Sequence, residues 1–75
     1  MSEMVLDVKG LTCPLPILRA KKALKTVPVD AVLTVIATDP ASVKDMEVFC
    51  RQTGNELLSS TEDGGSFTFR IKRLV

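Results

Sequence analysis

One cysteine stands where its thiol could do chemistry. Cys13 opens the segment Cys13-Pro14-Leu15-Pro16, between a predicted strand and a predicted helix, so it should be the N-cap residue or its neighbour. Pro14 restricts Cys13 to extended backbone, and both prolines suit a first helical turn, where an amide hydrogen has no partner. The helix dipole and the lysines that follow both favour a thiolate. The pattern therefore predicts a reactive thiol with a depressed pKa, although a cysteine that merely fills a turn fits the same residues.

Such a thiolate could attack the persulfide of another protein and then hold the sulfur that it takes. Pro16 occupies the position at which a thioredoxin-type site has its resolving cysteine, which disfavours a dithiol oxidoreductase. Cys50 lies beside Phe49 on the apolar arc of a second predicted helix, where free cysteine usually behaves as a small buried hydrophobe. A redox pair of Cys13 and Cys50 is therefore not favoured.

The absence of histidine and the low number of cysteines exclude several other mechanisms. The chain has no histidine, so a Cys-His nucleophilic pair cannot be built, and two cysteines are too few for a structural zinc site. We expect no metal and no cofactor. Asp39 and Ser42 are interpreted as helix caps whose carboxylate and hydroxyl could also border the site.

Basic residues follow Cys13 along the first predicted helix, and no acidic residue occurs between Asp7 and Asp30; the basic residues are Arg19, Lys21, Lys22 and Lys25. They form either an ordinary solvated helix face or a docking surface for an acidic partner, and their nearness to Cys13 supports the second interpretation. The net charge of +1 and the lack of stacking aromatic residues there predict no direct binding of nucleic acid.

The elements that position these residues follow from hydrophobic periodicity. Apolar residues alternate in some segments and recur every three or four residues in others. The predicted order is a strand at 4–9, a helix from 14 that Pro28 ends, a strand at 32–37, a helix from 40 to about 53 closed by Gly54, and strands at 56–61 and 67–72.

This order, β-α-β-α-β-β, predicts an α/β (α+β) two-layer sandwich. Right-handed crossovers place both helices on one face of a four-stranded mixed sheet and leave the other face open, with Thr34, Ile36, Arg70 and Lys72 as expected members. Seventy-five residues with 45% apolar content make a single domain over residues 1–75.

The chain is expected to act in the cytoplasm as a monomer. The segment Met1–Met4 lacks the basic start and apolar run of a secretory signal, and no apolar stretch is long enough to cross a membrane. A reducing cytosol would keep both cysteines as thiols.

With these motifs in view, the sequence resembles the TusA-like (SirA-like) family of sulfur-carrier proteins. The shared segments occur in the same order along nearly the whole chain: residues 6–16, residues 38–42, Asp45-Met46, Phe49-Cys50 and residues 54–57. The resemblance implies the same two-layer sandwich. It also implies that Cys13 matches the cysteine that carries a persulfide, and that the protein is a sulfur carrier or sulfurtransferase. The implied donor is a cysteine desulfurase or another sulfurtransferase, and the implied acceptor is a downstream protein.

Two departures from the family pattern concern the pathway. Leu15 stands where relatives in tRNA thiolation have an acidic residue between the prolines, and Asn55 stands where histidine is frequent. An apolar residue beside the sulfur would suit a different acceptor surface. The donor, the acceptor and the pathway therefore stay open among tRNA thiolation, thiosulfate use, molybdenum-cofactor supply and selenium metabolism. A different class of function also stays open, a non-catalytic interaction module that uses the basic helix or the open sheet face.

Overall fold

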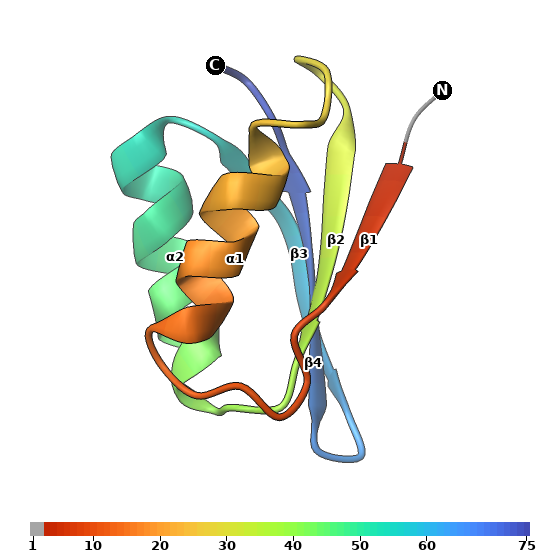
Figure 1. Cartoon of the computed structure of the whole chain (residues 1–75), viewed down its shortest axis with the longest axis vertical. Coiled ribbons are helices and arrows are strands. Elements are labelled where there is room, and N and C mark those ends of the chain that lie inside the picture. Colours follow the sequence, from red (N-terminus) through yellow and green to blue (C-terminus); the bar gives the residue numbers. More distant parts are fainter. Residues whose placement is uncertain (1–2) are drawn as a thin grey trace.

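The computed structural model describes residues 3–75, so Met1 and Ser2, which belong to the segment examined for a secretory signal, lie outside the described residues. The elements are β1 (Glu3–Asp7), α1 (Leu15–Leu24), β2 (Val32–Ala37), α2 (Ala41–Thr53), β3 (Glu56–Asp63) and β4 (Ser66–Lys72). Both helices cover the same face of the sheet (Figure 1). The predicted β-α-β-α-β-β order and two-layer sandwich are confirmed.

The four strands lie in the order β1-β2-β4-β3. β1 runs parallel to β2, whereas β4 is antiparallel to both β2 and β3, so the sheet is mixed as predicted. Burial alternates along β2, where Leu33, Val35 and Ala37 face the helices and the intervening residues do not. Thr34 pairs with the exposed Arg70 of β4 on the open face, as expected.

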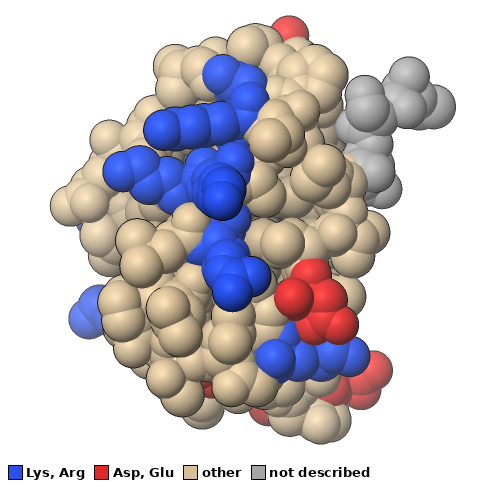
Figure 2. Space-filling model, viewed as in Figure 1, with Lys and Arg blue, Asp and Glu red and all other residues tan. Residues whose placement is uncertain are grey.

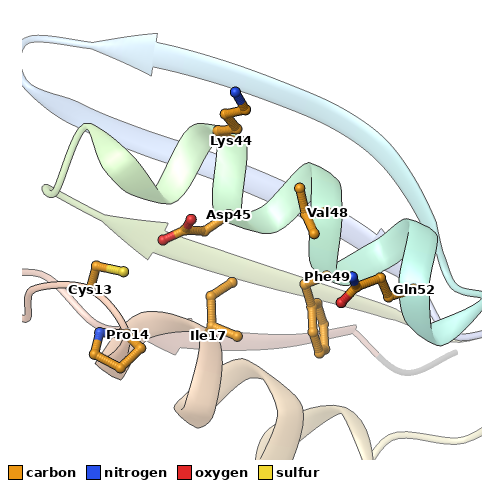
Figure 3. A pocket seen from close by; sticks show the side chains of 8 residues that line it. All are labelled: Cys13, Pro14, Ile17, Lys44, Asp45, Val48, Phe49 and Gln52. Carbon is orange, nitrogen blue, oxygen red and sulfur yellow. The ribbon is translucent and has the colours of Figure 1, made fainter.

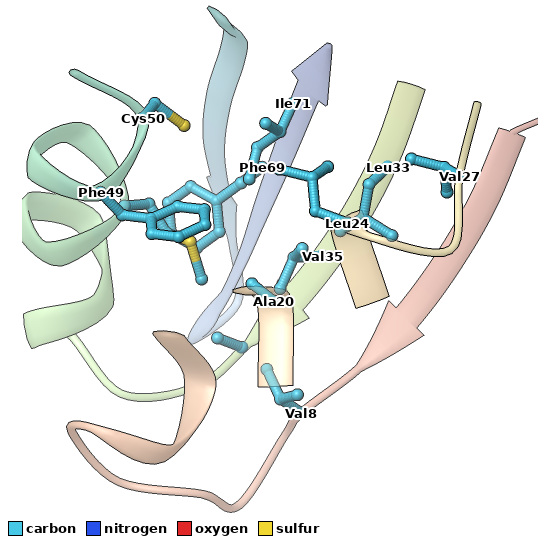
Figure 4. Close-up of a cluster of buried hydrophobic side chains, with 12 residues drawn as sticks. Val8, Ala20, Leu24, Val27, Leu33, Val35, Phe49, Cys50, Phe69 and Ile71 are labelled. Carbon is cyan, nitrogen blue, oxygen red and sulfur yellow. The ribbon is translucent and has the colours of Figure 1, made fainter. Parts of the chain in front are cut away.

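The core lies between the helices and the two central strands (Figure 4). Leu33 of β2 and Phe69 of β4 have no exposed surface, and Ala20 of α1 and Met46 of α2 pack against the same layer. Cys50 belongs to this cluster and is 3% exposed, which confirms its predicted burial. Each helix is therefore held to the sheet by its buried apolar side chains rather than by propensity alone.

The helix boundaries differ slightly from the predicted ones. α1 ends at Leu24, before Pro28, because the hydroxyl of Thr26 donates to the Ala23 carbonyl at 2.6 Å and helps to close the last turn. α2 begins at Ala41 rather than Pro40, and Pro40 is its N-cap residue. Asp39 still acts as a cap, since its Oδ1 accepts the Ala41 amide at 3.1 Å.

The end of α2 is as predicted. Gly54 adopts the left-handed conformation with φ of 80° and donates its amide to the Cys50 carbonyl. Among residues 3–75, no helix has the length and apolar character needed to cross a membrane.

Candidate functional site: an exposed thiol at the end of a groove

The parallel pairing of β1 and β2 brings two loops together. Both strands end at the same edge of the sheet, so the loop before α1 meets the loop before α2. The Gly10 amide donates to Thr38 Oγ1 at 2.9 Å, and the Cys13 amide donates to Asp39 Oδ2 at 2.7 Å. Asp39 thus joins the start of one helix to the turn that carries the thiol. Cys13 is held at the amino-terminal ends of both helices.

Cys13 precedes the N-cap residue of α1, which is Pro14, and its side chain is exposed. The Leu18 amide donates to the Pro14 carbonyl at 3.1 Å and so closes the first helical turn. Pro16 lies in that turn and is almost completely buried. The position next to the N-cap was one of the two predicted for Cys13. The buried Pro16 ring anchors the turn on the core.

A groove of about 370 Å³ lies between the two helices, with the Cys13 sulfur at one end (Figure 3). Pro14 and Ile17 line it on the α1 side. On the α2 side it is lined by Lys44, Asp45, Val48, Phe49 and Gln52. Most of this lining is apolar, and the Asp45 carboxylate lies beside the sulfur. The groove is large enough to take a side chain or a short segment of another protein beside the thiol.

The electrostatic environment of the sulfur differs from the predicted one. Hydrogen bonding to the Asp45 carboxylate raises the pKa of the Cys13 thiol, and desolvation and the negative charges of Asp45 and Asp39 act in the same direction. The predicted depression of this pKa was therefore wrong. The charges that act on the sulfur are the carboxylates of Asp45 and Asp39, at the start of α2, and none of the exposed basic residues of α1 is among them.

The sequence contains a signal for the α2 side of the groove. Residues 45, 48, 49 and 52 are spaced i, i+3, i+4 and i+7, which is one stripe of a helix. Asp45 and Val48 were assigned only to the side away from the apolar arc. Sequence reasoning therefore missed them as site residues, because nothing local shows that α1 packs beside this stripe. Ser42, a suggested border residue, is instead buried and donates its hydroxyl to the Asp39 carbonyl.

All four basic residues predicted on the first helix are exposed: Arg19, Lys21, Lys22 and Lys25. Figure 2 shows basic side chains gathered over the region of α1. The structure adds Arg73, whose Nη1 donates to the Val27 carbonyl at 2.7 Å just beyond α1 and which lines a second cavity with Lys21 and Lys25. We call these five residues the basic surface. It extends from the middle of α1 to the end farther from Cys13.

The second thiol has a different environment. Burial raises the pKa of Cys50 to about 11, and both cysteines are free. Because Cys50 packs in the core and Cys13 is exposed, the redox-pair alternative is disfavoured. The accessible chemistry is that of one thiol.

A two-layer domain that presents one exposed thiol at the end of a groove, with its other thiol buried, belongs to the class of single-thiol proteins rather than dithiol oxidoreductases. Comparison with known proteins narrows this class. A family model described as "Sulfurtransferase TusA" matches residues 4–73. The chain belongs to this family, which confirms the predicted resemblance and the sulfur-carrier function that it implied.

Individual relatives agree with the family match. The chain is 62% identical to the sulfur carrier protein TusA of Allochromatium vinosum, over 91% of this chain and 90% of that protein. It is 38% identical to TusA of Pseudomonas putida, over 95% and 89% of the two chains. The crystal structure of a SirA-like protein from Desulfitobacterium hafniense superposes with a TM-score of 0.82 at 26% identity, covering 96% and 99% of the chains. A sulfur carrier must meet both sulfur donors and sulfur acceptors, so this chain has protein or small-molecule partners of both kinds.

Proposed function

We propose that this sulfur carrier holds its sulfur on Cys13 as a persulfide. The observation that carries the proposal is the placement of the two cysteines: Cys13 is exposed at the end of the groove, and Cys50 is buried in the core. The Asp39 hydrogen bond to the Cys13 amide fixes the turn, and Pro14 and Pro16 stiffen it. A fixed, accessible thiol is what repeated transfer between partners requires.

The transfer is an exchange between sulfur atoms. The Cys13 thiolate attacks the outer sulfur of a donor persulfide, so that a new S–S bond forms at Cys13 while the S–S bond of the donor breaks. The donor cysteine leaves as a thiolate, and the outer sulfur now belongs to Cys13. In the second step a thiolate of the acceptor attacks this outer sulfur, and Cys13 leaves as a thiolate. No external oxidant or reductant is needed in either step.

The proposed donor is a cysteine desulfurase or another persulfide-bearing protein in the cytoplasm, and the proposed acceptor is a downstream protein, with the carrier acting as a monomer. The basic residues Arg19, Lys21, Lys22 and Lys25 would dock an acidic region of these partners. Leu15 and Leu18 are 42% and 54% exposed on the same helix. They offer apolar contact between the sulfur and the basic residues.

The test is to incubate the protein with a cysteine desulfurase and cysteine and to measure intact mass. Wild type and Cys50→Ala should each gain the mass of one sulfur atom, and Cys13→Ser should gain none. Absence of an adduct on wild type, or equal labelling of Cys13→Ser, would overturn the proposal.

A further inference from the structure

We propose that Asp45 holds the Cys13 thiol in its unreactive form until a partner protein places a cationic side chain beside that carboxylate. This inference rests on the proposed function, since it concerns how the carrier thiol is switched on. It assigns to Asp45 a positioning and control role at the groove. The surface of a fitting partner then has two features: acidic groups that contact the basic surface, and a cationic side chain that reaches Asp45.

The geometry begins with the groove. Asp45 is half-buried on α2, and Figure 3 shows its carboxylate directed toward the Cys13 sulfur at the end of the groove. The neighbouring Lys44 also lines the groove, but its side chain points away from the sulfur. The thiol therefore faces a carboxylate and no cation of its own groove.

The carboxylate of Asp45 has no cationic partner within the described part of the chain. The ion pair among residues 3–75 joins Lys9 to Asp7 at 3.8 Å, and neither residue lines this groove. Asp39, the other carboxylate near the thiol, already accepts the amides of Cys13 and Ala41. Asp45 is thus the charge near Cys13 that is free to pair with something outside the chain.

The consequence for reactivity follows from charge. A carboxylate beside a thiol disfavours the thiolate, and the thiolate is the form that attacks a persulfide. The raised pKa of Cys13 agrees with this arrangement. The free carrier should therefore react slowly with electrophiles that it meets by chance.

A lysine or arginine of a docked partner would pair with Asp45 and cancel its effect on the thiol. The thiol proton then passes to water, and the Cys13 thiolate attacks the outer sulfur of the persulfide as described above. A fitting partner thus has acidic groups opposite the basic surface and a cation beside its own reactive sulfur. A small persulfide that carries no cation cannot pair with Asp45 and should therefore be a poor sulfur donor.

The first experiment examines the free protein. Alkylation of Cys13 by iodoacetamide is followed across pH by peptide mass in wild type, in Asp45→Asn and in the control Glu47→Gln. Glu47 is exposed on α2 and does not line the groove, so its change removes the same charge at a neighbouring place. Asp45→Asn should move the midpoint of the pH profile to lower pH and raise the rate at neutral pH by about twofold, because part of the gain in thiolate is offset by its lower nucleophilicity.

The second experiment examines transfer with two donors, N-acetylcysteine persulfide, which has no cationic group, and a cysteine desulfurase supplied with cysteine. Asp45→Asn should accept sulfur about twofold faster from the small persulfide and no faster from the desulfurase. The preference of the carrier for the protein donor should therefore fall, and Glu47→Gln should keep it.

Three outcomes separate the possibilities. A pH profile of Asp45→Asn that matches that of Glu47→Gln overturns the role of Asp45, and Asp45→Ser provides a second variant for the same comparison. An equal acceleration with both donors overturns release by a partner cation. In both of these cases the proposed function survives, provided that wild type still takes up sulfur on Cys13. The proposed function itself fails if Cys13→Ser takes up as much sulfur as wild type.

Discussion

Two carboxylates interact with different parts of Cys13, one with its backbone amide and the other with its thiol. Asp39 accepts the backbone amide of Cys13 at 2.7 Å and the Ala41 amide at 3.1 Å, so it positions the turn. Asp45 faces the sulfur and raises the pKa of the thiol. Asp39 therefore holds the turn in place, and Asp45 has the larger effect of the two on the pKa of the thiol.

At this scale, Asp39→Ala should lower the free energy of unfolding by about 1–2 kcal/mol, because two amides lose a charged acceptor at the starts of both helices. Urea denaturation measures the change. Glu47→Ala is the control, since the side chain of this exposed α2 residue makes no hydrogen bond with any residue that the structure describes, and its change should stay within about 0.5 kcal/mol. An equal loss in both variants would contradict the bridging role of Asp39.

α2 serves the core and the site with different faces. Met46 and Cys50 pack into the core, and the stripe that begins at Asp45 lines the groove. A turn of α2 about its own axis would move both sets of side chains out of place. The contacts at its two ends help to fix its orientation. Asp39 caps the start, and Gly54 closes the end in the left-handed conformation.

Gly54 ends α2 with a backbone conformation that few other residues adopt. A Cβ at this position would approach Val75 Cγ1 no closer than 3.9 Å, an ordinary contact, so the cost of Gly54→Ala comes from the backbone alone. We expect a loss of about 1 kcal/mol in the free energy of unfolding, measured by thermal or urea denaturation. Gly54→Asn is the matched control and should lose less, because asparagine tolerates the left-handed region better. A loss for asparagine as large as that for alanine would indicate a steric cause instead.

For the whole molecule, the near-neutral net charge of +1 hides a separation of charge. Basic side chains gather over α1 (Figure 2), while the carboxylates of Asp39 and Asp45, at the start of α2, lie near the thiol. A partner that complements both regions would be attracted over a distance and then oriented at the groove.

This separation predicts the effect of charge reversal. The double variant Lys22→Glu, Lys25→Glu should slow sulfur transfer from a cysteine desulfurase about tenfold at low ionic strength, and added salt should shrink the difference. Iodoacetamide alkylation of Cys13 should not change, because neither lysine lines its groove. The control variant Arg51→Glu, Lys72→Glu reverses the same number of charges outside α1.

Slow transfer in the control as well would show a general charge effect rather than docking through α1. A Cys13→Ser protein that still supports every downstream process would favour the alternative of a non-catalytic interaction module. The two measurements together separate carrying sulfur from merely binding a partner.

Much of the fold could be predicted because its signals are local. Alternation predicted the strands, three-to-four spacing predicted the helices, and Gly54 and the prolines predicted their ends within a few residues. The place of Cys13 beside the α1 N-cap and the burial of Cys50 followed from the same local patterns. Side-chain periodicity and backbone restriction depend on neighbours in the chain, so the sequence by itself determined these features.

Only the tertiary structure decided the strand order and what faces the thiol. Asp45 is 32 residues from Cys13 in the sequence, and the two meet because parallel β1 and β2 bring the starts of α1 and α2 to one edge of the sheet. Local reasoning counted the lysines that follow Cys13, gave the Asp39 carboxylate no weight in the charge balance and missed Asp45, so it predicted the wrong direction for the pKa of the thiol. Electrostatic effects depend on distance through space, and packing sets that distance.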